Sequence, residues 1–93
     1  MGIVADHIRS TLERAFSPQR LEILDDSAKH SGHVGAREGG ESHFSVIIVS
    51  QAFDGLSRVA RQRRVNAELA DLLAGPVHAL SLQTLTPSEV ANS

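Results

Sequence analysis

The five histidines are the residues of this chain best suited to bind a metal, because the chain contains no cysteine. An imidazole nitrogen can ligate iron, and imidazole in place of thiolate on one iron of a cluster raises the reduction potential. Histidine also protonates near neutrality, so a cluster held in this way is labile and sensitive to pH. Since the chain offers no thiolate, any cluster bound here needs sulfur ligands from another molecule.

Three histidines are candidate ligands, and each also has a plainer interpretation. His30 and His33 form an H-x-x-H pair in a glycine-rich segment, where this spacing also arises by chance between two solvated side chains. His78 falls in a predicted strand, where the residues alone favour a partly buried structural histidine. His43 is interpreted as structural, although it could stand in as a ligand, and His7 is expected to be exposed on a helix.

A cluster of arginines forms a second candidate site, with Arg58, Arg61, Arg63 and Arg64 inside seven residues. On a helix, Arg58, Arg61 and Arg64 are spaced by three and fan across one side. That arrangement suits contact with phosphates or with an acidic partner surface. The plainer interpretation is a solvated helix face, and the net charge of −2 does not favour general nucleic-acid binding.

The turn before these arginines belongs to the same candidate surface and contains Phe53, Gly55 and Ser57. Its Asp-Gly pair breaks the chain direction, and Ser57 is a good residue to cap the following helix. A KH domain clamps nucleotides with a G-x-x-G loop, whereas the equivalent turn here, F-D-G-L, has one glycine. Sequence-specific DNA binding is therefore the second hypothesis for function.

Neither an enzyme nor a membrane protein is expected. The sequence has no cysteine nucleophile, no G-x-S-x-G and no P-loop, and the adjacent Asp25 and Asp26 would face opposite ways along a strand. The start, MGIVADHIRS, lacks the pattern of an export signal, and no apolar run approaches the roughly 20 residues that cross a bilayer. A cytoplasmic location is expected.

The apolar pattern predicts two helices and three strands. Apolar residues at steps of four, from Val4 to Phe16, indicate an amphipathic helix that Pro18 ends. A second apolar stripe follows the arginines and ends at a Gly-Pro pair. Alternating or continuous apolar runs predict the strands. The expected elements are a helix over 3–16, strands over 20–25 and 43–50, a helix over 58–73 and a strand over 77–85.

This α-β-β-α-β order predicts an α/β (α+β) two-layer sandwich. The first two strands would form an antiparallel hairpin with the second strand central, and a right-handed crossover would bring the third strand into a mixed sheet. Both helices would then cover one face of the sheet. We expect one domain over 1–93, with an ordered core over 3–87, a flexible loop over 28–41 and a frayed tail over 88–93.

Three blocks of sequence, at matching distances, resemble the BolA-like family over about residues 3 to 89. They are DDSAKHSGH, then GGESHFSVIIVSQAFDGLSRVARQRRV, then GPVHALSLQTLTPSE. The most specific parts are the ESHF that opens the second strand, the F-x-G-x-S-R-V turn and the H-A-L of the third strand. The helix departs from the family pattern, because Gln62 sits near the usual histidine and Asn66 replaces the usual tyrosine.

The resemblance implies a fold similar to class II KH domains and a monothiol glutaredoxin as partner. In that heterodimer the two proteins share a 2Fe-2S cluster, to which the glutaredoxin and glutathione contribute sulfur. The family histidine before Ala-Leu corresponds to His78, and the loop ligand corresponds to His30 first and His33 second, which is the histidine subgroup of the family. The isolated chain is expected to hold no cofactor and to be a monomer or a weak homodimer.

Overall fold

The computed structural model describes residues 2–25 and 43–91, which contain every predicted helix and strand. The predicted element order is confirmed; two short helical segments, η2 and α4, are added to it, and the second predicted helix is divided into α2 and α3. The elements are α1 (Ile3–Phe16), β1 (Arg20–Asp25), β2 (His43–Val49), η2 (Gln51–Phe53), α2 (Arg58–Glu68), α3 (Ala70–Ala74), β3 (Ala79–Leu85) and α4 (Pro87–Ala91). The predicted flexible loop, 28–41, lies outside the described residues.

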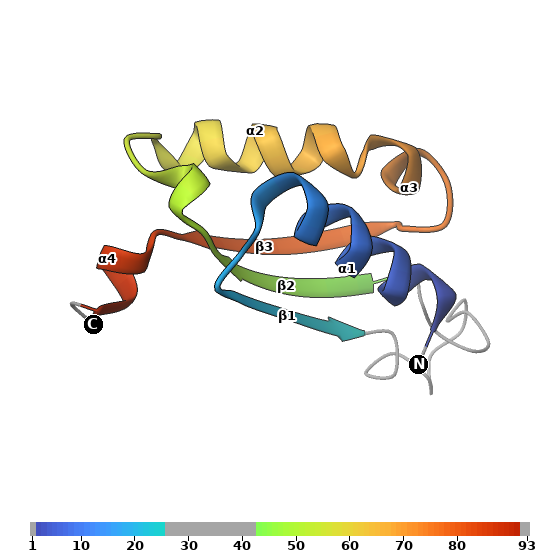
Figure 1. Cartoon of the computed structure of the whole chain (residues 1–93). Helices are drawn as coiled ribbons and strands as arrows, with labels where there is room; N and C mark the ends of the chain where they lie inside the picture. Colours follow the sequence, from blue (N-terminus) through green and yellow to red (C-terminus); the bar gives the residue numbers. More distant parts are fainter. Residues whose placement is uncertain (1, 26–42, 92–93) are drawn as a thin grey trace.

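The three strands form one mixed sheet in the order β1-β2-β3. β2 pairs with β1 antiparallel and with β3 parallel, so the prediction of a central second strand is confirmed. Figure 1 shows α1 and α2 on the same face of the sheet, with α4 beyond the end of β3. This is the predicted two-layer arrangement, in which α1 and α2 cover one face of the sheet.

The core lies between the helix layer and alternate residues of the sheet. From α1 it receives Ile8, Leu12 and Phe16, which share one helix face because they are spaced by four. From β2 it receives Phe44, Val46 and Ile48, which alternate onto one side of the strand. Val65, Leu69 and Leu72 close the core from above.

Two boundaries differ from the prediction. The helix expected over 58–73 is divided at Leu69, whose φ of −100° and ψ of 14° leave the helical region while its side chain stays in the core. The tail expected to fray over 88–93 is helical as far as Ala91. The reason is a T-x-x-E capping box: the Thr86 N–H donates to Glu89 Oε1 at 2.9 Å, and the Glu89 N–H donates to Thr86 Oγ1 at 3.2 Å.

Candidate functional site

His78 is an exposed residue that directly precedes β3, at the end of the sheet where that strand begins. Its position is set by Val77, which is 3% exposed in the core and whose N–H donates to the Leu72 carbonyl at 3.0 Å. Alternation alone would place His78 on the side of Leu80 and Leu82, which pack against the core. His78 is nevertheless exposed, because it lies just before the strand begins at Ala79. The partly buried histidine favoured by the residues alone is therefore wrong.

The register of the sheet brings three chain segments to this end of the molecule. His43 lies opposite Ala79, the residue after His78, and Asp25 lies opposite Phe44. The end of β1 and the starts of β2 and β3 therefore lie together at one end of the sheet, which Figure 1 shows on the side of the N-terminus. We name this end of the sheet the histidine end, defined by Asp25, His43 and His78.

The structure does not place the two loop candidates. His30 and His33 lie outside the described residues, between Asp25 and His43, which flank them in the chain. Within 2–25 and 43–91, no three His, Cys, Asp or Glu side chains gather in a group that could hold a metal. A metal at the histidine end would therefore need ligands beyond the described residues. His7 is exposed on α1, as predicted.

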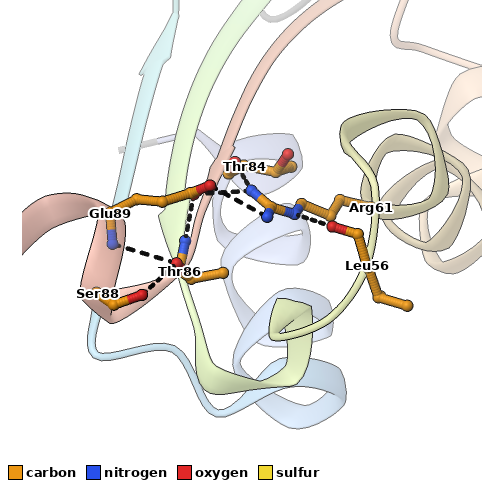
Figure 2. A network of polar contacts seen from close by, with 6 residues as sticks. All are labelled: Leu56, Arg61, Thr84, Thr86, Ser88 and Glu89. Atoms are coloured by element: carbon orange, nitrogen blue, oxygen red, sulfur yellow. Dashed lines mark hydrogen bonds and ion pairs between the residues drawn. The ribbon is translucent and has the colours of Figure 1, made fainter.

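The opposite end of the sheet holds a buried polar network around Arg61, which Figure 2 shows. Arg61 is only 6% exposed, and its guanidinium donates to the Leu56 carbonyl at 3.0 Å and to the Thr84 carbonyl at 3.1 Å. It also donates to both carboxylate oxygens of Glu89, at 2.8 and 3.2 Å. The bidentate pair joins α2 to α4, and the bond to Thr84 joins α2 to β3. We name this end of the sheet, defined by Leu56, Arg61, Thr84 and Glu89, the arginine end.

The network corrects the prediction that Arg61 contacts nucleic acid or a partner. Its donors are used inside the molecule, because Arg61 lies four residues before Val65 on the buried stripe of α2. The neighbouring Gln62 also turns inward, donating from Nε2 to the Leu82 carbonyl at 3.2 Å. Both side chains attach α2 to β3 and are structural.

The electrostatics of this network act mainly on Glu89. The hydrogen bond from Arg61, and after it the one from the Thr86 N–H, lower the pKa of Glu89 from 4.5 to about 2. Both bonds favour the charged carboxylate over the neutral acid. Glu89 is thus an anion throughout the physiological range and holds α4 against Arg61.

The turn residues of the candidate surface also have structural roles. Phe53 is fully buried, with its ring centroid 5.2 Å from that of Phe16, so the prediction that it contacts a partner is wrong. Gly55 has a φ of +81°, a left-handed conformation that favours glycine. Ser57 caps α2, since its hydroxyl oxygen accepts from the Ala60 N–H at 3.1 Å.

What remains of the predicted arginine surface is the outer side of α2. Arg58, Arg63 and Arg64 are exposed, and Val59 beside them is 59% exposed. These side chains could meet phosphates or an acidic surface, and an apolar contact at Val59 would suit a protein partner. No helix within the described residues has the length and apolar character to cross a membrane.

Comparison with known proteins places these features in a family. The family model described as BolA-like protein matches residues 12–89. The chain is 45% identical over 89 residues to human BolA-like protein 1, covering 96% of this chain and 62% of that protein. It is 41% identical over 87 residues to the DNA-binding transcriptional regulator BolA of Vibrio cholerae, covering 94% of this chain and 78% of that one.

A solved structure agrees with the fold. The BolA domain of SufE1 from Arabidopsis thaliana superposes with a TM-score of 0.84 at 42% identity, covering 96% of this chain and 98% of that domain. The two chains are therefore similar both in fold and in amino-acid sequence. The chain spans 62% of the length of the mammalian relatives, so it corresponds to a part of them.

Proposed function

This chain belongs to the BolA-like protein family, and from that premise we propose that it is a non-enzymatic adaptor for iron–sulfur cluster trafficking or iron regulation. The partner is a monothiol glutaredoxin, bound as a heterodimer that bridges a 2Fe-2S cluster. This chain supplies His78 and one of His30 and His33, with His30 as the first choice. The glutaredoxin and glutathione supply sulfur to the other iron.

The observation that carries this proposal is the exposure of His78 at the open end of a rigid strand. Val77 anchors the backbone in the core, so the imidazole is presented at the surface from a fixed point. Asp25 and His43, which flank the segment with His30 and His33, lie at the same end of the sheet. An imidazole set on rigid structure but open to solvent is suited to complete coordination that another molecule begins.

The donor set fits one iron of such a cluster. Imidazole donors without any thiolate leave the other iron to external sulfur, and this makes the partner obligatory for cluster binding. When bound, the cluster supplies electron-transfer or transferable iron–sulfur chemistry. Imidazole in general ligates iron only in its neutral form, so a cluster held through imidazole is sensitive to acid.

The test mixes this chain with cluster-loaded glutaredoxin and records visible circular dichroism. We expect His78→Ala to abolish the heterodimer spectrum, whereas His7→Ala, a matched change at an exposed histidine on α1, leaves it unchanged. His30→Ala and His33→Ala then decide which loop histidine takes part. An unchanged spectrum for folded His78→Ala would remove the ligand assignment.

DNA binding is the second candidate, favoured by the exposed Arg58, Arg63 and Arg64 and by the Vibrio cholerae relative, which is a DNA-binding regulator. The logarithm of DNA affinity decreases with the logarithm of salt concentration, and the steepness of this decrease is reduced by about 0.9 for each phosphate that the protein no longer neutralises. Replacing the three arginines with alanine should therefore weaken binding to duplex DNA and flatten that slope, while Arg14→Ala on α1 serves as control. An unchanged slope would exclude this surface.

A further inference from the structure

β1 is an edge strand whose outer side is unprotected within the described residues. It has six residues, includes neither Lys nor Pro, and carries Leu24 at 59% exposure. A shallow hollow of about 360 Å³ follows it, lined by Leu21, Glu22, Ile23, Leu24 and residues of its neighbours. Edge strands of this kind present unpaired backbone groups that can pair with another strand.

The backbone of β1 directs specific groups outward. The Gln19 N–H donates to the Val49 carbonyl at 2.9 Å, while the Ser50 N–H donates to Leu85 of β3 at 3.0 Å. The backbone N–H and C=O groups of Val49 therefore point towards β1, and those of its register partner Arg20 point towards β2. Because backbone directions alternate along a strand, Leu21 and Ile23 turn their N–H and C=O groups to the outer edge.

The charged side chains of β1 are complementary to those of a second, antiparallel copy of the same strand. Arg20 and Glu22 lie on the face of the sheet that points away from α1 and α2, with Val49 and Ile47 as their register partners, and they form an exposed ion pair with each other. In an antiparallel pairing of two copies about Leu21, Arg20 of each copy faces Glu22 of the other. A pairing about Glu22 would place the two carboxylates opposite one another, and a pairing about Ile23 would set Glu22 against Leu24.

We propose that two copies of this chain associate through β1, with Leu21 at the two-fold axis, to form a continuous six-stranded sheet. The outward backbone groups of Leu21 form the central hydrogen-bonded pair, and two Arg20–Glu22 pairs flank it. Pro18, which lacks an N–H, ends the ladder, so 19–23 of each copy take part. An interface this small gives a weak, reversible dimer.

The test uses two single variants, R20E and E22R, followed through β1 amide shifts in NMR over a concentration series that reaches the millimolar range. Each variant places like charges opposite one another twice, by symmetry, and should weaken self-association about tenfold. Mixing the two variants restores both opposite-charge pairs, so the mixture should associate at least as well as the unmodified chain. R63E and E68R on α2 are matched charge controls without effect.

Three results would overturn the proposal. They are an unmodified chain that stays monomeric at millimolar concentration, single variants that associate normally, or a mixture that does not recover. If the chain is monomeric, the strand that pairs with β1 would be an extended segment of another protein. These outcomes are independent of the proposed function, because neither substitution touches a histidine.

Discussion

The two ends of the sheet treat their polar side chains in opposite ways. At the arginine end, the Arg61 guanidinium is buried and donates to Leu56, Thr84 and Glu89. At the histidine end, the His78 imidazole is exposed on a strand that the core holds in place. A side chain whose donors are used inside the fold contributes stability, and one left open on a rigid element can serve a partner.

Among the substitutions that test this difference between the two ends, Arg61→Ala is expected to lower the unfolding free energy most. Removing this partner leaves the Glu89 carboxylate without its guanidinium and the Leu56 and Thr84 carbonyls without this donor. Because Glu89 is partly exposed, the loss of unfolding free energy should lie below the about 3–5 kcal/mol that breaking a fully buried pair costs. Arg64→Ala, at an exposed position of the same helix, is the control. Urea denaturation measures both, and equal losses would contradict the comparison.

Acid should reduce the stability that the Glu89 carboxylate contributes at the arginine end. The folded-state pKa of Glu89 is about 2, below its usual value of 4.5, so its contribution is fully present above pH 4.5. That contribution declines as the pH falls from 4.5 towards 2, because the unfolded state then binds the proton more readily. Glu89→Gln should reduce the slope of stability against pH in this window. If the slope does not change, the ion pair has no energetic role.

A smaller effect is expected from Ser57→Ala, which removes the cap of α2. The hydroxyl satisfies one orphan N–H at the start of the helix, and its loss costs about 1 kcal/mol of unfolding free energy. Ser57→Gly should cost less, since glycine is a tolerated cap. The same denaturation assay would detect the difference. A cost equal to that of Arg61→Ala would mean that the helix start, rather than the buried pair, stabilises this end.

The smallest effect on stability is expected at the histidine end itself. His78→Ala removes an exposed side chain and should change the unfolding free energy by less than about 0.5 kcal/mol. The same substitution is expected to abolish the heterodimer spectrum described above. A large loss of stability would instead assign His78 to the fold and remove the contrast with Arg61.

Sequence patterns predicted the fold because they report periodicity directly. The step of four from Ile8 to Phe16 and the alternation from Phe44 to Ile48 each define one buried face, and both were confirmed. Spacing alone misled at Arg61, since steps of three from Arg58 suggested a shared exposed side. The step of four from Arg61 to Val65 was the better signal, because it continues the buried stripe.

The partners of Arg61 were less accessible to sequence reasoning. The T-x-x-E pattern at Thr86 indicates a capping box and could have predicted α4, yet nothing local connects Glu89 to a helix 28 residues earlier. Such long-range pairs depend on the sheet register. The exposure of His78 likewise depends on where β3 begins, a boundary that the apolar pattern placed two residues too early.

Direct detection of nitrogen ligation tests the central claim about the histidine end. The chain would carry 15N-histidine in a reduced heterodimer with unlabelled glutaredoxin, and pulsed electron paramagnetic resonance would record hyperfine couplings. The account predicts 15N couplings from ligating imidazole that are lost in His78→Ala and unaffected by His7→Ala. A cluster without 15N coupling, or with couplings unchanged in His78→Ala, would contradict it.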